Sequence, residues 1–387
     1  MKPKVLLCAT VDYHFKAFHL PMMEWFQKNG WEVHVAAKGE LSLQYVDRKF
    51  NIPIHRSPIS LDNVKAYREL KSIIDKEGYS IIHCHTPMGG ALARLAARGA
   101  RKRGAKVVYT AHGFHFYKGA PLANWLLYYP IEKFLATVTD CLITINNEDF
   151  RRALTDRFRA REIHHVHGVG VPTGTFCPLS EEGKKELRSL YNYSEDQFLM
   201  IYGAEFNANK NQELIIRALA KLKEKMPDAK LLFAGEGTML GSCRDLANQL
   251  GVAQMVDFLG YRKDMKQLMP ICDVAVSSSL REGLPVNIME AMASGLPIVA
   301  TTNRGHQELI EEGRNGFLVE PNDVEAFASR LQLLYNFRES RLEMGRRSLE
   351  RVKDYSIDRV QMELQELYKP LMEQTVEETE RLQWNAL

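Results

Sequence analysis

A chain of 387 residues is longer than one hydrophobic core usually organises, so two domains of about 200 residues or fewer are expected. Its composition, 45% hydrophobic and 26% charged, excludes a disordered chain, and no run of about 18 apolar residues is present to form a transmembrane helix. Residues 1–172 carry 25 Lys and Arg against 15 Asp and Glu, whereas residues 173–387 carry 26 against 33, so the N-terminal half is basic.

Short β-rich runs alternate with longer helical patterns in the first half of the chain. Strands are predicted at residues 4–9, 31–37, 80–83, 106–110 and 141–145. The pattern restarts in the second half, with strands at 198–202, 230–234, 255–259, 274–277 and 297–300 and helices such as 212–225 and 243–250. This alternation predicts two parallel α/β domains in tandem.

A Gly- and Pro-rich stretch at 167–175 marks the linker between the two domains. We therefore place the first domain at 1–172 and the second at 173–355. Residues 356–387 begin with a predicted helix, from about residue 357 to 371, and this segment is expected to cross back onto the first domain.

The six cysteines contain no Cys-x-x-Cys pair, and several lie in apolar runs. They are interpreted as reduced core residues of a cytoplasmic protein. The histidines His83 and His85 end a predicted strand, but no carboxylate stands at ligand spacing, so no bound metal is expected.

The segment 277–300 combines a strand, a tight loop, a short helix and a second strand. Gly283 permits a turn, Pro285 suits the first helical position, and Gly295 ends the helix. Free N–H groups at such a helix start, at the carboxyl edge of a parallel sheet, favour the binding of a diphosphate.

Glu282 on this loop and Glu290 on the helix are separated by seven residues. On a nucleotide sugar, one carboxylate would accept hydrogen bonds from the transferred sugar and the other from the ribose. The alternative is that both are surface residues, and the surrounding strand, loop and capped helix argue against it.

The chain resembles a family 4 glycosyltransferase of the GT-B fold, whose Glu-x7-Glu motif matches Glu282 and Glu290. The resemblance covers nearly the whole chain. In segments 8–21 and 110–129, the chain resembles in particular the enzymes of bacterial exopolysaccharide and capsule clusters. It implies two Rossmann-like domains that face each other across a cleft, and a retaining, metal-independent enzyme without a cofactor. The donor is a nucleotide diphosphate sugar, most often of uridine, and the acceptor is a saccharide on a polyprenyl diphosphate.

The resemblance also assigns the donor-binding residues. Lys210 contacts phosphate, and Glu205 occupies the position where the family usually carries a phosphate-binding Arg. The residues at the helix start and in the base-binding glycine turn are Gly283, Leu284, Pro285, Val286, Asn287, Gly235 and Gly237. An ordinary strand-to-helix turn explains the two glycines of that turn equally well. His112 follows a first-domain strand and is assigned to the donor sugar near the reacting carbon, the alternative being a histidine that holds its own loop.

The first domain is expected to receive the acceptor and to rest on the inner leaflet of the cell membrane. Its basic cluster at 98–106 and the aromatic segment at 114–129 favour contact with anionic lipid. The residues assigned to this acceptor and membrane side are Asp12, His14, Lys16, Phe116, Lys118 and Trp125.

Two other functions remain open for this architecture: a nucleotide-sugar epimerase, and a sugar-binding protein without catalysis. A dinucleotide-dependent dehydrogenase is disfavoured, because no Gly-x-Gly-x-x-Gly follows the first strand. Nucleic acid is not an expected partner, and the oligomeric state is left open.

Overall fold

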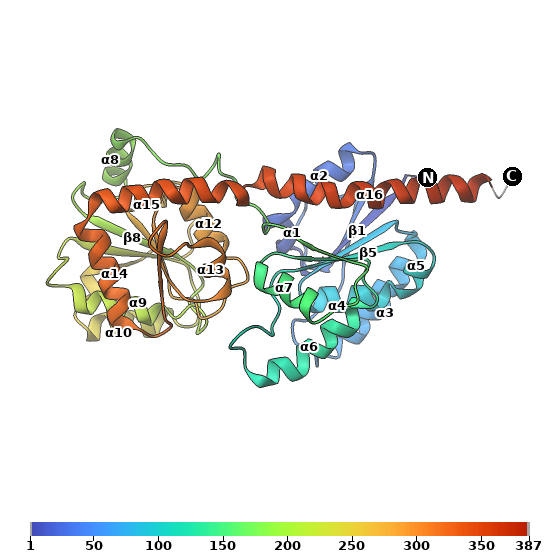
Figure 1. Cartoon of the computed structure of the whole chain (residues 1–387), viewed down its shortest axis with the longest axis horizontal. Helices are drawn as coiled ribbons and strands as arrows, with labels where there is room; N and C mark the ends of the chain where they lie inside the picture. The colour runs from blue at the N-terminus through green and yellow to red at the C-terminus, as the bar shows by residue number, and fades with distance from the viewer. Residues whose placement is uncertain (1, 385–387) are drawn as a thin grey trace. The chain divides into compact units, whose positions relative to one another are not determined.

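The computed structural model describes the backbone of residues 2–384 and the side chains of residues 2–373. The chain divides into two compact units (Figure 1). The first unit contains Met1–Val169 together with Asp358–Leu387, and the second contains Gly170–Ile357.

The first unit is built on a seven-stranded parallel sheet with the order β3-β2-β1-β4-β5-β6-β7. Its strands are β1 (Lys4–Val11), β2 (Glu32–Lys38), β3 (Arg48–Asn51), β4 (Ile81–His85), β5 (Lys106–Ala111), β6 (Cys141–Thr144) and β7 (Glu162–His165). Its helices are α1 (Tyr13–Phe18), α2 (Leu20–Lys28), α3 (Asp62–Glu77), α4 (Pro87–Ala96), α5 (Arg98–Lys102), α6 (Leu122–Ala136), α7 (Asn147–Thr155) and α16 (Ile357–Trp384).

The second unit is built on a six-stranded parallel sheet with the order β10-β9-β8-β11-β12-β13. Its strands are β8 (Phe198–Gly203), β9 (Ala229–Ala234), β10 (Val256–Phe258), β11 (Val274–Ser277), β12 (Ile298–Thr301) and β13 (Gly316–Val319). Its helices are α8 (Glu181–Leu190), α9 (Gln212–Leu222), α10 (Leu240–Gln249), α11 (Met265–Leu268), α12 (Val286–Ala293), α13 (Arg304–Leu309), α14 (Val324–Asn336) and α15 (Arg338–Arg351), with 3-10 turns at Ala253–Met255 and Val352–Tyr355.

Both faces of the first sheet are covered by apolar side chains, as a parallel sheet requires. Along β1, Val5 and Leu7 belong to one buried cluster, whereas Leu6 and Cys8 belong to the other. Successive side chains of a strand point to opposite faces, so the continuous apolar run of β1 fills both cores.

The last helix, α16, completes the first unit. Val360, Tyr368 and Leu371 are buried in the same cluster as Val5 of β1. The Tyr368 hydroxyl hydrogen-bonds His83 on β4, in a fully buried contact. The helix therefore packs against the sheet of the first unit, although the chain enters it from the second unit.

The ten strands expected from the sequence are all present, within about two residues at each end. Three strands were not predicted: β3, β7 and β13. All three are four-residue strands at or next to the open edges of their sheets. The two in the first unit read Arg-Lys-Phe-Asn and Glu-Ile-His-His, and half-exposed edge strands of this kind carry no apolar run.

The strand order reverses direction between β1 and β4 in the first sheet, and between β8 and β11 in the second. Ligands of open α/β sheets bind outside the carboxyl ends of the strands at such switch points. Each unit therefore has one preferred position for a binding site.

Candidate active site

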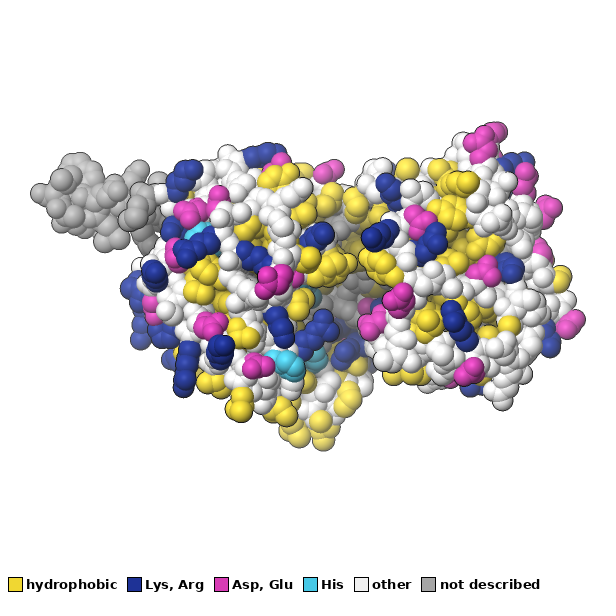
Figure 2. All heavy atoms as spheres, turned by 180° about the vertical axis from the view of Figure 1, so that it is seen from behind, with side chains coloured by type: hydrophobic (Ala, Val, Ile, Leu, Met, Phe, Trp, Pro, Cys, Tyr) yellow, Lys and Arg dark blue, Asp and Glu magenta, His cyan; other side chains and the backbone are white. Residues whose placement is uncertain are grey.

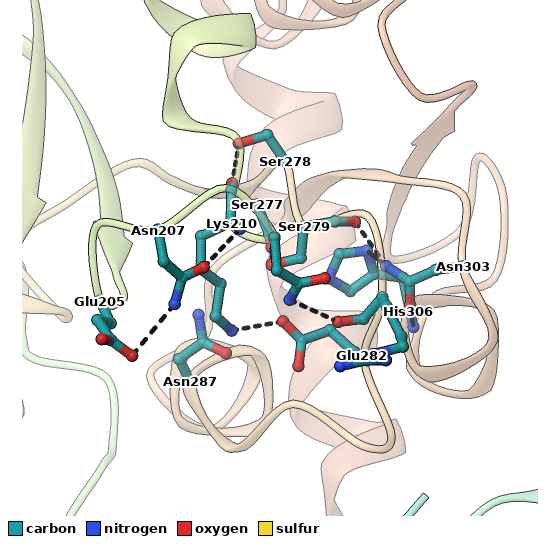
Figure 3. Close-up of polar contacts among 12 residues, drawn as sticks. Glu205, Asn207, Lys210, Ser277, Ser278, Ser279, Glu282, Asn287, Asn303 and His306 are labelled. Carbon is teal, nitrogen blue, oxygen red and sulfur yellow. Dashed lines mark hydrogen bonds and ion pairs between the residues drawn. The ribbon is translucent and has the colours of Figure 1, made fainter. Parts of the chain in front are cut away.

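In the second unit, the loops that follow β8 and β11 bring Lys210 and Glu282 together. The Lys210 Nζ lies 2.5 Å from the Glu282 Oε1 (Figure 3), and both side chains are largely buried. Burial acts against the charged form of Lys210, but the attraction of Glu282 outweighs it and raises the pKa of the lysine above its ordinary value. A permanent cation is thus fixed at the switch point of this sheet.

The backbone of the Lys210 loop is bound to the end of β11 by side-chain hydrogen bonds. The Ser278 hydroxyl donates to the Lys210 carbonyl over 2.8 Å, and the buried Tyr202 hydroxyl also donates to it over 3.1 Å. The Asn209 side chain donates to the Arg281 carbonyl over 3.0 Å. These contacts hold the lysine and the glutamate loop as one piece, which limits reorganisation when a ligand binds.

Helix α12 begins directly after the Glu282 loop, and its first turn is open. Pro285 occupies the N-cap position, and no side chain within the described part of the chain caps this helix. The Asn287 side chain points instead to the Gly203 carbonyl at the end of β8, 3.1 Å away. Uncapped N–H groups at the positive end of a helix favour an anion such as a diphosphate.

Glu290 lies on α12, one turn beyond Asn287, and its side chain is part-buried. Desolvation raises the pKa of Glu290 to about 7. Its charge therefore changes in the physiological range, whereas the carboxylate of Glu282 is held by Lys210.

The predicted glycine turn after β9 packs directly on the loop after β8. A Cβ on Gly235 would lie 1.9 Å from the Ala204 carbonyl oxygen, and one on Gly237 would lie 2.3 Å from that of Phe206. Both glycines are therefore required by backbone packing, whatever the ligand. Glu205 lies on the same loop, is exposed, and accepts a hydrogen bond from Asn207 over 3.1 Å.

Two residues of α13 support the Glu282 loop and were not predicted from the sequence. The Arg304 Nε donates to the Glu282 carbonyl over 3.1 Å. Gly305 lies so close to the loop that a Cβ there would be 2.8 Å from the Glu282 Cβ and 3.0 Å from the Gly283 carbonyl oxygen. No local motif marks this glycine, because the requirement arises from a loop more than 20 residues earlier in the chain.

Replacing Gly305 by valine is expected to lower the rate of catalysis at this site at least about tenfold, because the new side chain displaces Glu282 and small misplacements at a reacting centre are costly. The measurement is the steady-state rate together with a thermal melt. Gly241→Ala on α10 is the matched control, since a Cβ there meets nothing within 4 Å. Unchanged activity of the folded valine variant would show that the loop does not position Glu282.

In the first unit, four histidines meet at the carboxyl ends of β1, β4 and β5. They are His14 on α1, His19 after it, His85 at the end of β4, and His112 after β5. One ring nitrogen of each lies within 4.8 Å of the others. Burial lowers the pKa of all four, to about 4 for His14, so the imidazoles are neutral at pH 7. Sequence reasoning singled out His14, His85 and His112 separately, but not the group.

Of the remaining residues assigned to the acceptor and membrane side, Asp12 and Lys16 are joined by a backbone hydrogen bond at the start of α1, and the rings of Phe116 and Trp125 are in contact. Asp12 is buried and paired with Lys49, its Oδ2 lying 2.6 Å from the lysine Nζ. Burial opposes ionisation of Asp12, but the hydrogen bonds from Lys49 and from the Leu41 amide outweigh it and hold its pKa below the ordinary value. Asp12 therefore anchors the chain after β2. Lys16, in contrast, is exposed on α1.

In the aromatic segment, Phe116 is fully buried against Phe114, so it has no surface with which to touch lipid or acceptor. Trp125 is half-buried on α6, beneath the guanidinium of Arg152. Lys118, by contrast, is exposed. The aromatic residues thus belong mainly to the core.

The outward face of α6 is apolar and uncharged. Its exposed apolar residues are Leu122, Leu126, Leu127, Ile131 and Phe134, with exposed fractions of 72%, 71%, 47%, 42% and 54%. Hydrophobic side chains gather along the lower edge of the first unit in Figure 2, where α6 runs in Figure 1. Contiguous apolar surface of this kind marks a contact with a protein or a membrane. Within the described residues, no helix is both long and apolar enough to span a bilayer.

The chain has two parallel-sheet α/β units, and a cation and two acidic side chains lie at the switch point of the second. This is the arrangement of the GT-B class of glycosyltransferases. A model of glycosyl transferases group 1 matches residues 183–351, and a glycosyl transferase 4-like model matches residues 4–146. The fold is that of the Anabaena protein HepE in complex with UDP, with a TM-score of 0.76 and 18% identity over 96% of this chain and 100% of that one.

Sequence comparison is more specific. The chain is 50% identical to EpsD of Bacillus subtilis (strain 168), a protein named as a glycosyltransferase, over 98% of this chain and 99% of that protein. It is 29% identical to an Escherichia coli UDP-Gal:alpha-D-GlcNAc-diphosphoundecaprenol alpha-1,3-galactosyltransferase, over 73% of this chain and 74% of that one. The chain belongs to the group 1, family 4-like glycosyltransferases, and it is an enzyme of that class.

Proposed function

We propose that this enzyme transfers a sugar, with retained anomeric configuration, from a uridine diphosphate sugar to a saccharide linked to a polyprenyl diphosphate, in exopolysaccharide or capsule synthesis. The observation that carries the proposal is the Lys210–Glu282 ion pair beside the open first turn of α12. The E. coli relative acts on a diphosphoundecaprenol-linked sugar, and HepE binds UDP, which supports the two substrate classes.

The donor would bind to the second unit. The diphosphate lies at the first turn of α12 and near Lys210, the ribose hydroxyls donate to Glu290, and the transferred sugar lies near Glu282. In this arrangement, Lys210 and the N-terminus of α12 balance the charge of the diphosphate, and no metal ion is required. His112 of the first unit is the proposed hydrogen-bond partner of the donor sugar.

The chemical step breaks the bond between the anomeric carbon and the phosphate oxygen. The sugar gains positive charge while the leaving diphosphate gains negative charge, which Lys210 and the helix terminus stabilise. The acceptor hydroxyl forms the new bond on the same face and gives its proton to the leaving phosphate oxygen. No separate protein base is required.

Proton NMR of the product tests this mechanism directly. Incubation of the enzyme with a UDP-sugar and a polyprenyl-linked acceptor, in the presence of a chelator, is expected to release UDP and to give a product with the donor's anomeric configuration. An inverted product would contradict the same-face step. If the sugar of the donor is converted and no acceptor-linked product forms, the protein is an epimerase. If the donor binds without turnover, it is a binding protein.

Donor binding is expected to strengthen as the pH rises through about 7. The Glu290 carboxyl has a pKa of about 7, so it is protonated below that pH and is then a weaker acceptor for the ribose hydroxyls. Above that pH, the carboxylate accepts a hydrogen bond from each of the two ribose hydroxyls. The KM for the donor should fall between about pH 6 and pH 8 in the wild type. Glu290→Gln should show a high KM without this step, and the same pH profile in both proteins would exclude Glu290 from the binding site.

The apolar face of α6 supports peripheral attachment to the inner leaflet, where a polyprenyl-linked acceptor resides. A helix with exposed leucine and phenylalanine side chains gains free energy by entering the acyl boundary of a membrane. Lys and Arg side chains of the basic first unit, including the exposed Lys118 and the 98–106 cluster, add attraction to anionic headgroups.

A further inference from the structure

The four clustered histidines of the first unit are drawn from three separate places in the chain. His14 lies in the first turn of α1, His19 is the residue between α1 and α2, His85 is the last residue of β4, and His112 follows β5. β1, β4 and β5 are neighbours in the sheet, so their carboxyl ends deliver these side chains to one point. His19 and His85 are 9% and 1% exposed, whereas His14 and His112 are part-buried, so the group lies at the border between the interior and the surface.

The polar atoms of this group are poorly satisfied by the protein itself. The Nε2 atoms of His14 and His19 lie 3.0 Å apart, and the His85 Nδ1 lies 3.2 Å from the His112 Nε2, so these contacts join one imidazole to another. The His85 Nε2 is buried and has no hydrogen-bond partner within the described part of the chain. Buried polar atoms without partners are rare, and they point to a missing ligand.

We propose that His14, His19, His85 and His112 form a binding site for a divalent transition-metal ion of the Zn²⁺ type. Neutral imidazoles are the ligands that Zn²⁺, Cu²⁺ and Ni²⁺ favour, whereas Mg²⁺ and Ca²⁺ require oxygen ligands, which this group does not contain. In a regular tetrahedron with Zn–N distances of about 2.0–2.1 Å, the nitrogens lie about 3.4 Å apart. The present span of at most 4.8 Å reaches that geometry through side-chain shifts of about 1 Å or less.

The proposed metal ligands all belong to the first unit, whereas Lys210, which would serve the diphosphate, belongs to the second. The ion would have a regulatory effect, because it would take one ring nitrogen of His112 and fix the orientation of the ring, so that the contact of His112 with the donor sugar would change. Zn²⁺ is therefore expected to inhibit transfer. This consequence rests on the proposed function, whereas the binding of the metal does not.

The binding experiment uses the full-length chain without an affinity tag and Co²⁺ as the probe, because the visible absorption of Co²⁺ reports its coordination geometry. One Co²⁺ per chain is expected to give an intense tetrahedral spectrum that Zn²⁺ abolishes. His19→Gln and His85→Gln should each weaken binding at least about tenfold, since each removes one ligand. His55→Gln, a change at an exposed histidine outside the cluster, should bind as the wild type does.

Circular dichroism shows whether each variant is folded, and two separate ligand positions are tested in case one of them does not tolerate glutamine. A wild-type chain that gives no tetrahedral Co²⁺ spectrum would overturn the proposal without any variant. A folded His19→Gln or His85→Gln variant that binds Co²⁺ with the affinity of the wild type would overturn it as well. Because the spectrum needs neither donor nor acceptor, its outcome is independent of whether the proposed transfer is correct.

Discussion

Lys210→Ala is expected to lower kcat by about a hundredfold to a thousandfold, the usual effect of removing one preorganised group that stabilises developing charge. The lysine is fixed 2.5 Å from Glu282 at the switch point of the second sheet, so the change removes the cation of this ion pair. The KM for the donor should rise too, because the proposed donor position has the same cation facing the diphosphate in the ground state. Steady-state kinetics with the UDP-sugar measure both effects.

The matched control is Lys221→Ala, which removes an exposed ion pair with Glu325 in the same unit. Exposed pairs contribute about 0–1 kcal/mol, so neither activity nor the melting temperature should change appreciably. Full activity of Lys210→Ala, in a protein that melts as the wild type does, would remove the lysine from the proposed site. Loss of activity in the control to the same extent would show that the effect is not specific to the site.

The combined change Leu126→Asp and Phe134→Asp is expected to abolish binding to anionic vesicles, with a loss of at least about tenfold in the partition coefficient. Each side chain would otherwise contribute about 1–2 kcal/mol by leaving water, and each new carboxylate is repelled by anionic headgroups. Both residues are more than half exposed, so folding should be little affected. Flotation with vesicles that contain phosphatidylglycerol measures the binding.

Leu190→Asp is the control for the α6 changes, because Leu190 is 74% exposed at the end of α8 in the second unit. This variant should float with the vesicles as the wild type does. Vesicle binding that is unchanged in the α6 variant, or weak in the wild type at low salt, would contradict membrane attachment through this helix. Transfer to a short water-soluble acceptor should be unaffected by either change.

Much of the fold follows from local sequence pattern, because the interior strands are continuous apolar runs. Val5 and Leu6 exemplify this: they fill opposite faces of the first sheet. The edge strand β3 could not be predicted in the same way, since Arg48 and Lys49 lie on a half-exposed edge and resemble a polar loop. Hydrogen bonding to β2 forms that strand, and that contact is not visible in a local window.

The sequence predicts candidate residues for the site, but not the contacts between them. Glu282 and Glu290 lie within one motif, and Lys210 lies in another. That Lys210 and Glu282 form an ion pair depends on β8 and β11 being neighbours in the sheet, although their loops are 72 residues apart. The histidine group shows the same limit, because His14 and His112 come together only through the strand order.

The way α16 completes the first unit also determines how the enzyme can be divided. The chain passes from the first unit to the second after Val169 and returns at Asp358, so no single cut yields two intact halves. A fragment that ends at residue 169 would expose the apolar surface that Val360, Tyr368 and Leu371 now cover. Exchanging one half of this enzyme for that of a relative, to alter its acceptor or its donor, therefore requires that the terminal helix be exchanged together with the N-terminal part.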